Sequence, residues 1–486
     1  FLDRLVLAID PGHGRRAQDY EKAMRGRNRL LAEGSRDRAW FDAIEMQMVE
    51  AGKLDLDAPL ERYVPGVMPV NPFPESEPMT LRQLLCHRSG FVRESPVGGY
   101  LDGTEPGLAR MLASLPQTVL PTPPLAKMRY SNVGPSVAGH AVERSAGMTF
   151  EEYQRKNILD PLGMKDSAWS HRELGTQRVV PSHLRVADGR GGFDRRRTPV
   201  FDLGTVPAGN LFTTADDLAL FVSMLAAEGR SRDGTVILRP ETLREMFTPQ
   251  LIDENSGFGL AFSVGSYRGR KSVGHNGAVY GFSSSLSFLP EEKLGVVVLG
   301  NEDIVNARIQ KLAHLGLDLM LEAKLGATPA ASPVEIEVST AELAAFAGEY
   351  ESQSYWASLS VVGGRLMGNI SSQPTRFRAV EPLRFLADSA MYNSAPAVFQ
   401  KDDSGQVTGF SLGGQTYRRA PGQPAPIPDA WQSFLGSYGP WFIPLVVHER
   451  HGHLYATTEN MVDYRLTPVN EYLFELRSGM YVNEYL

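Results

Sequence analysis

The chain has 486 residues, of which 42% are hydrophobic and 22% charged, and its formal net charge is −7. This length is enough for two or three domains, and the composition is ordinary for a globular protein. The mildly acidic balance gives no basic footprint for nucleic acid. No apolar run reaches the roughly 18 residues that a membrane-spanning helix needs. We therefore expect no nucleic-acid partner and no membrane span.

The single cysteine, Cys86, excludes an intramolecular disulfide. The chain starts at Phe1, and its first residues lack the basic, apolar and small-residue order of a signal peptide. A cytoplasmic location and a periplasmic or secreted one both stay open, and so does the oligomeric state.

Residues 1–34 form an atypical N-terminal arm. Residues 5–9 are typical of a short strand, which Pro11-Gly12 breaks, and a basic stretch with six Lys and Arg side chains follows up to Arg29. We expect a solvated, loosely ordered segment there. An alternative interpretation is that residues 9–14 are similar to the zinc-site opening of muramoyl-alanine amidases.

Helical and strand patterns alternate through the middle of the chain. Apolar residues at helical spacing and their flanking caps predict helices over residues 41–53, 81–87, 133–147 and 149–158. Thr80 can cap the second of these helices. Residues 285–289 alternate in polarity and residues 294–299 are almost continuously apolar, which predicts a pair of strands around a turn.

The last third of the chain has a different sequence pattern from the part before it. Residues 326–335 are small, proline-containing and poor in charge, which is typical of a linker. Short alternating segments with glycine turns follow, and they contain an approximate internal repeat: Phe346–Tyr350 matches Phe434–Tyr438, and Gly364–Leu366 matches Gly452–Leu454. Two such units predict a small antiparallel barrel or sandwich over residues 336–486. Whether the second unit is complete stays open.

Two triplets carry the candidate chemistry. Tyr130-Ser131-Asn132 lies between a proline-rich loop and a predicted helix, and His275-Asn276-Gly277 lies in a predicted strand. A tyrosine in such a place could accept a proton from a nucleophile if nearby cations lowered its pKa. The asparagine amide could hold a substrate carbonyl or amide. Taken alone, each triplet would more often be structural.

Together with residues 147–150 and 158–164, the two triplets resemble the serine β-lactamase/DD-peptidase superfamily, in particular its class C β-lactamase-like and esterase branch. Residues 80–90 and 210–219 are similar to scaffold segments of that family, and we expect His87 to be a buried hydrogen-bonding residue. Some relatives carry a lipocalin-like barrel after the hydrolase domain, and the tail of this chain looks like one.

The resemblance implies acyl transfer. A serine attacks a carbonyl, an acyl-enzyme forms, and backbone amides hold the oxyanion. The family places its third motif on an edge strand beside the cleft, where a Lys or His contacts the substrate and a glycine lets the substrate backbone approach closely. Tyr130 and His275 are therefore expected to be catalytic, and Asn132 and Gly277 to bind substrate. The implied substrates are esters, β-lactams and D-amino-acid peptides, with no metal and no cofactor.

The nucleophile is the exception to this resemblance. The family needs a Ser-x-x-Lys motif, and the sequence contains none. Counting back from the helix that ends at Gly52 places the motif at Ser35, but Arg38 stands at the lysine position. A lysine can lose its proton in a buried site and act as a base, whereas an arginine stays charged. Alternatively, Ser35 is an N-cap serine.

The predicted architecture is α/β, with an antiparallel sheet flanked by helices in residues 35–325, a linker at 326–335 and a β-rich, lipocalin-like domain at 336–486. We expect a β-lactamase-like serine hydrolase with Ser35, Arg38, Tyr130 and His275 as catalytic residues. The alternative from another class is a catalytically impaired relative that binds a peptide or partner through the old cleft. A gene with a damaged 5′ portion would give the same sequence.

Overall fold

The computed structural model describes residues 4–9, 32–33, 42–100, 102–175, 178–187, 193–253, 256–328, 333–439, 443–457, 462–477, 481 and 484–486. The chain divides into two compact units, one of Phe1–Leu184 with Arg197–Pro329 and the other of Arg185–Arg196 with Ala330–Leu486. Each unit has its own hydrophobic core. No helix of the described ranges combines the length and the apolar character that crossing a membrane requires.

A seven-stranded sheet organises the first unit, with the strand order β1-β11-β10-β9-β8-β7-β6. All neighbouring strands run antiparallel except β1 and β11, which are parallel. The strands are β1 (Arg4–Ile9), β6 (Leu251–Asp253), β7 (Ser256–Phe258), β8 (Ser263–Tyr267), β9 (Arg270–Val279), β10 (Phe282–Leu289) and β11 (Leu294–Gly300).

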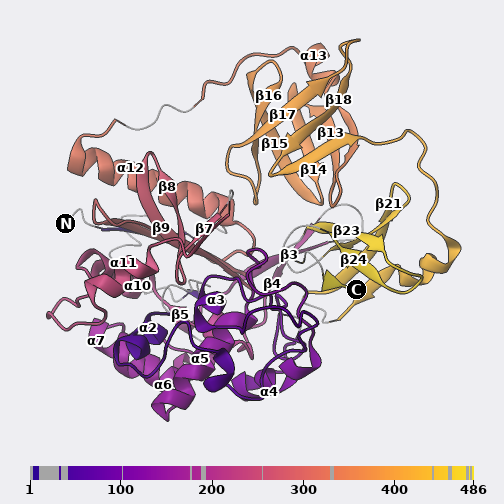
Figure 1. Cartoon of the computed structure of the whole chain (residues 1–486). Helices are drawn as coiled ribbons and strands as arrows, with labels where there is room; N and C mark the ends of the chain where they lie inside the picture. The colour runs from indigo at the N-terminus through magenta and orange to yellow at the C-terminus, as the bar shows by residue number, and fades with distance from the viewer. Residues whose placement is uncertain are drawn as a thin grey trace. The chain divides into compact units, whose positions relative to one another are not determined.

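Strand β11 shows why the sheet has helices on both faces. All seven of its residues are buried, as expected for a strand covered on two sides. Because side chains alternate along a strand, Val296 and Val298 pack against α12 (Asn306–Leu325), while Val297 joins the core on the other face. There α10 (Ala215–Ala226) packs so closely that a Cβ at Gly295 would lie 2.3 Å from Val222 Cγ1. Figure 1 shows α12 along one side of the sheet.

The remaining helices of the first unit begin and end at identifiable caps. Thr80 and Gln83 form a capping box at the start of α3, and Thr149 and Glu152 form one at α6. Helix α5 ends at Gly147, whose φ is 69°. These helices are α2 (Asp42–Glu50), α3 (Leu81–Leu85), α4 (Gly107–Ser114), α5 (Val133–Ala146), α6 (Phe150–Gln154), α7 (Asp160–Leu162), α8 (His171–Leu174), α9 (Val206–Gly209) and α11 (Pro240–Met246).

Short elements complete the part of the chain before residue 330, and most of the β3–β4 hairpin belongs to the second unit. Strand β2 pairs with β5, and β3 pairs with β4 in a separate two-stranded sheet. They are η2 (Leu60–Arg62), η3 (Leu115–Gln117), η4 (Arg155–Leu159), β2 (Ala32–Glu33), β3 (His183–Ala187), β4 (Phe193–Arg197) and β5 (Phe212–Thr213).

The second unit contains a closed barrel of eight antiparallel strands, in which β12 pairs with both β13 and β19. Aromatic side chains fill its interior, and Phe410 stacks on Tyr417 with 4.5 Å between ring centroids. A barrel of this strand number is just wide enough to be filled by side chains. The elements are α13 (Thr340–Ala344), β12 (Gly348–Glu351), β13 (Trp356–Val362), β14 (Arg365–Ile370), β15 (Gln373–Glu381), β16 (Arg384–Asp388), β17 (Ala395–Lys401), β18 (Val407–Leu412) and β19 (Gln415–Arg419).

A six-stranded sheet follows the barrel, and its strands are paired in chain order. Asp463, at the start of β23, joins this sheet to the barrel by accepting a hydrogen bond of 2.8 Å from Trp356 Nε1 and one of 2.7 Å from Ser372 Oγ. The elements are η6 (Asp429–Phe434), β20 (Gly436–Tyr438), β21 (Leu445–Arg450), β22 (His453–Thr457), β23 (Asp463–Pro468), β24 (Phe474–Leu476) and β25 (Glu484–Tyr485).

These elements confirm the predicted fold class, an α/β domain with a helix-flanked sheet followed by an all-β barrel region. The exact domain boundaries remain a prediction. One detail differs from the expectation for the N-terminal arm: residues 4–9 are an edge strand of the main sheet, in parallel register with β11. Most of the arm, including residues 10–14 with their amidase-like sequence, lies outside the described residues.

Candidate active site

Four aromatic rings from separate segments meet at one place in the first unit. Tyr130 lies just before α5 and His275 lies in β9, and their ring centroids are 6.3 Å apart. The ring centroids of Phe258, in β7, and His275 are 6.1 Å apart. The ring of His87 lies 4.5 Å from Tyr130 and 4.8 Å from Phe258. His275 is buried, whereas Tyr130 is partly exposed, so the tyrosine is the more accessible of the two.

Ser131 fixes the backbone on which Tyr130 is carried. Its hydroxyl donates a hydrogen bond of 2.7 Å to the Val92 carbonyl oxygen. Ser131 Oγ also accepts hydrogen bonds from the backbone N–H groups of Val133 and Gly134, at 3.1 and 3.2 Å. It thereby satisfies two of the N–H groups that the start of α5 leaves without helical partners. The motif's middle residue is thus a helix-capping anchor that orients its neighbours.

Asn132 is held by a buried pair of charges. Its side-chain nitrogen donates to Glu94 Oε1, and the same oxygen lies 3.6 Å from Arg93 Nε. The side chains of Arg93 and Glu94 are 4% and 15% exposed. The Arg93 guanidinium carbon lies 5.4 Å from the Tyr130 ring centroid, within the range of a cation–π contact. Sequence analysis missed both residues, because the segment around them carries no motif.

Strand β9 changes its environment at His275. Its pairing with β8 ends at Ser263–Gly274, while its pairing with β10 continues to Val279. Along His275–Val279, β8 therefore no longer covers that edge of β9. Side chains from outside the sheet also hold this stretch. Asn306 Nδ2 donates a 2.6 Å hydrogen bond to the Gly277 carbonyl oxygen, and the Tyr100 hydroxyl donates to the carbonyl oxygen of the next residue.

His87 is a buried residue that makes a hydrogen bond, as expected. It is 1% exposed, and its Nδ1 accepts a 3.3 Å hydrogen bond from the Ser131 N–H. Cys86 beside it is also buried, and burial raises the pKa of its thiol to about 11. Because the thiolate is the reactive form of cysteine, Cys86 is not poised to act as a nucleophile.

The structure thus brings Tyr130, Asn132 and His275 to the same region, with Gly277 two residues further along β9. Ser35 and Arg38 lie outside the described residues, so the position of the predicted nucleophile relative to these groups stays a prediction. The roles of all six predicted site residues likewise stay predictions.

Comparisons with known proteins give two kinds of relative. The chain is 27% identical over 336 residues to penicillin-binding protein 4 of Amycolatopsis lactamdurans, covering 66% of this chain and 84% of that protein. It is also 57% identical over 83 residues to the DNA replication and repair protein RecF of Mesorhizobium japonicum, covering 16% of this chain. The corresponding match to RecF of Agrobacterium fabrum is 73% over 52 residues. The chain spans 22% and 14% of the lengths of these two RecF proteins.

Among solved structures, the octameric penicillin-binding protein homologue from Pyrococcus abyssi aligns with a TM-score of 0.53 at 23% identity, covering 80% of this chain and 88% of that one. At this identity the likeness shows a shared fold. The profile of the Beta-lactamase family matches residues 43–319. Because that match spans more than half of the 486 residues, the protein belongs to the Beta-lactamase family, within the serine β-lactamase/DD-peptidase superfamily.

Proposed function

We propose that this protein is a β-lactamase-like serine hydrolase that acts on esters or D-amino-acid peptides through an acyl-enzyme. The observation that carries the proposal is the meeting of Tyr130 and His275, from distant parts of the sequence, at 6.3 Å between ring centroids. Asn132, held by Glu94, supplies an amide in the same region. A tyrosine, a histidine and an oriented amide form a set that can move a proton and hold a substrate carbonyl or amide.

In the proposed reaction, Tyr130 acts as a phenolate and accepts the proton of the Ser35 hydroxyl while that hydroxyl attacks the carbonyl carbon. The alcohol or amine then leaves with that proton, and water releases the acid from the acyl-enzyme. The edge of β9 along His275–Val279 would take the substrate as an added strand. Gly277 offers no side chain to obstruct that approach.

The residues at the Ser-x-x-Lys position, Ser35 and Arg38, determine the rate of hydrolysis that we expect. Arg38 stands where the family has lysine, and a guanidinium cannot accept a proton from Ser35. General-base assistance is typically worth 10²–10⁴-fold in rate. We therefore expect weak hydrolysis or none from this chain unless Tyr130 replaces the missing base.

A second candidate is a catalytically impaired relative that binds a peptide or partner through the same cleft. The RecF similarity favours it. The Beta-lactamase match begins at residue 43, and the internal repeat accounts for the C-terminal region, so we infer that the RecF-like stretch includes the N-terminal arm. The segment that should carry the nucleophile would then come from an unrelated protein.

Turnover of a p-nitrophenyl ester by the parent, Ser35→Ala and Arg38→Lys separates the two candidates. Labelling with a fluorescent phosphonate, followed by mapping of the modified residue, identifies the nucleophile directly. Hydrolysis and labelling that are lost in Ser35→Ala and increased in Arg38→Lys support the hydrolase with an impaired first motif. A fast parent with an equally fast Ser35→Ala places the nucleophile elsewhere and refutes the site. No turnover and no labelling in any of the three supports the binding protein.

A further inference from the structure

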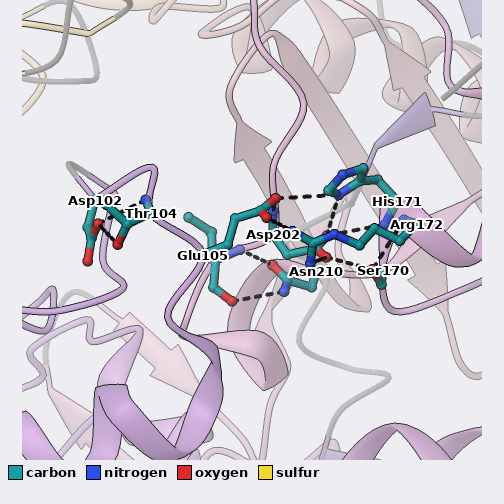
Figure 2. Close-up of polar contacts among 9 residues, drawn as sticks. Asp102, Thr104, Glu105, Ser170, His171, Arg172, Asp202 and Asn210 are labelled. Carbon is teal, nitrogen blue, oxygen red and sulfur yellow. Dashed lines mark hydrogen bonds and ion pairs between the residues drawn. The ribbon is translucent and has the colours of Figure 1, made fainter.

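A second polar cluster lies in the first unit, apart from the rings around Tyr130. Figure 2 shows Glu105, His171, Asp202 and Arg172 converging from three segments that are distant in sequence. His171 begins α8, whereas Glu105 precedes α4 and Asp202 precedes α9. The side chains of Glu105, His171 and Asp202 are 17%, 11% and 14% exposed. The cluster is therefore largely shielded from solvent.

The distances in this cluster match those around a bound metal ion. One ligand atom from each of Glu105, His171 and Asp202 lies within 4.8 Å of the others. His171 Nδ1 is 3.0 Å from Asp202 Oδ1 and 3.7 Å from Glu105 Oε1. Nitrogen and oxygen ligands about 2.1 Å from Zn²⁺ in tetrahedral geometry are separated from each other by roughly 3.4 Å. An ion could thus be reached by all three side chains with small movements.

The surroundings already hold the ligand groups in place. Asp202 Oδ2 accepts a 2.6 Å hydrogen bond from Ser170 Oγ, and the Asp202 N–H donates to Glu105 Oε1 at 3.0 Å. Asn210 holds the chain beside Asp202, since its side chain bonds both the N–H and the carbonyl of Leu203 at 2.9 Å. Such supporting hydrogen bonds are typical around metal ligands.

The cluster already holds a cation, the Arg172 guanidinium. Two carboxylates face one region, and the charge that balances them comes from Arg172, which bonds Glu105 and lies 3.8 Å from Asp202 Oδ2. Arg172 is 65% exposed, so its side chain can move into solvent without leaving a buried gap. We propose that Glu105, His171 and Asp202 form a binding site for a divalent transition-metal ion such as Zn²⁺, and that the ion displaces the Arg172 guanidinium.

This site lies next to a segment that contacts the residues of the candidate active site. The loop that ends at Glu105 carries Glu94, which holds Asn132, and Tyr100, whose ring lies 4.7 Å from Tyr280 and whose hydroxyl bonds the carbonyl after Gly277. A metal that joins Glu105 to α8 and to the Asp202 segment would fix the far end of this loop. The proposal does not depend on hydrolysis by this chain.

The test uses the full chain, freed of metal by chelation and titrated with Zn²⁺ by calorimetry, and with Co²⁺ by visible absorption. We expect one tight equivalent. His171→Ala should weaken binding by more than about 100-fold, beyond the 10–100-fold that loss of an outer partner typically costs. Arg172→Ala should bind as tightly as the parent or more tightly, because the competing cation is gone. His451→Ala/His453→Ala, in the other unit, is the control for adventitious binding and should bind normally.

X-ray absorption of the Zn²⁺-loaded parent provides a readout that does not depend on how the variants fold. One imidazole nitrogen together with oxygen ligands supports the site. Lack of a stoichiometric equivalent in the parent overturns the proposal. Binding that survives His171→Ala but is lost in the His451/His453 variant also overturns it, as does a weaker affinity in Arg172→Ala, since Arg172 would then assist binding.

Discussion

Replacement of Asp463 tests how the two β-sheets of the second unit are held together. This residue is fully buried. Its Oδ2 accepts hydrogen bonds from Trp356 Nε1 and Ser372 Oγ and lies 3.3 Å from His448 Nε2, while Oδ1 accepts from Thr457. The donors come from both the barrel and the six-stranded sheet, so a single carboxylate satisfies polar groups of both.

The size of the effect follows from the donors that lose their acceptor. In Asp463→Asn the amide nitrogen can take the place of Oδ1, and the Thr457 hydroxyl can rotate to accept from it. We therefore expect a loss of about 1–3 kcal/mol in the free energy of unfolding, the cost of one poorly satisfied buried group. Asp463→Ala removes every acceptor and should cost about 3–5 kcal/mol, as breaking a buried charged network typically does. Asp403→Asn, in an exposed turn of the barrel, is the matched control and should be neutral.

The pH dependence provides an independent check on the same residue. Burial raises the pKa of Asp463, but hydrogen bonds from His448, Ser372 and Thr457 and the charge of His448 outweigh burial, so that the pKa lies below its usual value. The carboxylate therefore contributes stability above the usual pKa of about 3.9, and this contribution is lost as the pH falls through the lower, folded-state pKa. The difference between parent and Asp463→Asn should shrink on acidification.

Urea unfolding followed by Trp fluorescence and by circular dichroism, at pH 7 and at several lower values, measures both effects. Equal stability of parent and Asp463→Asn at pH 7 would refute the reasoning about the buried acceptor. A difference that grows as the pH falls below about 4, the range in which the carboxyl itself titrates, would show that the sign of the pKa shift is wrong.

Three further predictions concern the first unit. Thr80→Ala removes a capping-box hydroxyl from α3 and should lower the free energy of unfolding by about 1 kcal/mol, with Thr80→Ser close to the parent. Gly229 and Gly234 both have positive φ, but a Cβ at Gly229 would lie 2.0 Å from a carbonyl oxygen, whereas one at Gly234 meets nothing within 4 Å. Gly234→Ala should therefore cost roughly 1–2 kcal/mol in thermal or urea unfolding, and Gly229→Ala clearly more; equal losses would contradict the close approach. Asn306→Ala removes the hydrogen bond to Gly277 and should lower the free energy of unfolding by about 1 kcal/mol. Compared with the parent, hydrogen exchange should become faster in the second half of β9 but not in β11. Unchanged exchange in β9 would argue against this anchor.

Local signals in the sequence predicted the local elements well. The glycine after residue 146 marks the end of α5, and the apolar run at 294–299 corresponds to the fully buried strand β11. Thr80 caps α3 as its position before an apolar helix indicates. In each case the cause of the structure lies within a few residues of its effect, in a cap, a left-handed glycine or an alternating pattern.

Contacts between distant segments could not be predicted in the same way. Nothing in residues 4–9 indicates that they pair in parallel with β11, because strand pairing at such separation depends on the whole fold. Arg93 and Glu94 belong to no motif, yet folding brings them against Tyr130 and Asn132. The cluster of Glu105, His171 and Asp202 has the same origin, since its members share no spacing in the sequence.

The two copies of the internal repeat, at Phe346–Tyr350 and Phe434–Tyr438, share their local geometry. Tyr350 donates a 2.8 Å hydrogen bond to the Phe346 carbonyl oxygen, and Tyr438 donates one of the same length to that of Phe434. The glycines that begin β12 and β20, Gly348 and Gly436, both have a positive φ, at 146° and 151°. Local geometry is thus repeated closely.

The environments of the two tyrosines nevertheless differ. Tyr350 is fully buried, because β19 pairs with β12 and Arg419 Nη2 donates to the tyrosine oxygen at 3.1 Å. Tyr438 is 45% exposed, and β20 pairs with β21 alone among the described strands. Closure of a small barrel requires enough strands for the last to meet the first, commonly about eight. The first repeat has eight described strands and closes, whereas the second has six and stays an open sheet. The same motif therefore produces a core tyrosine or a surface tyrosine according to the strands that follow it.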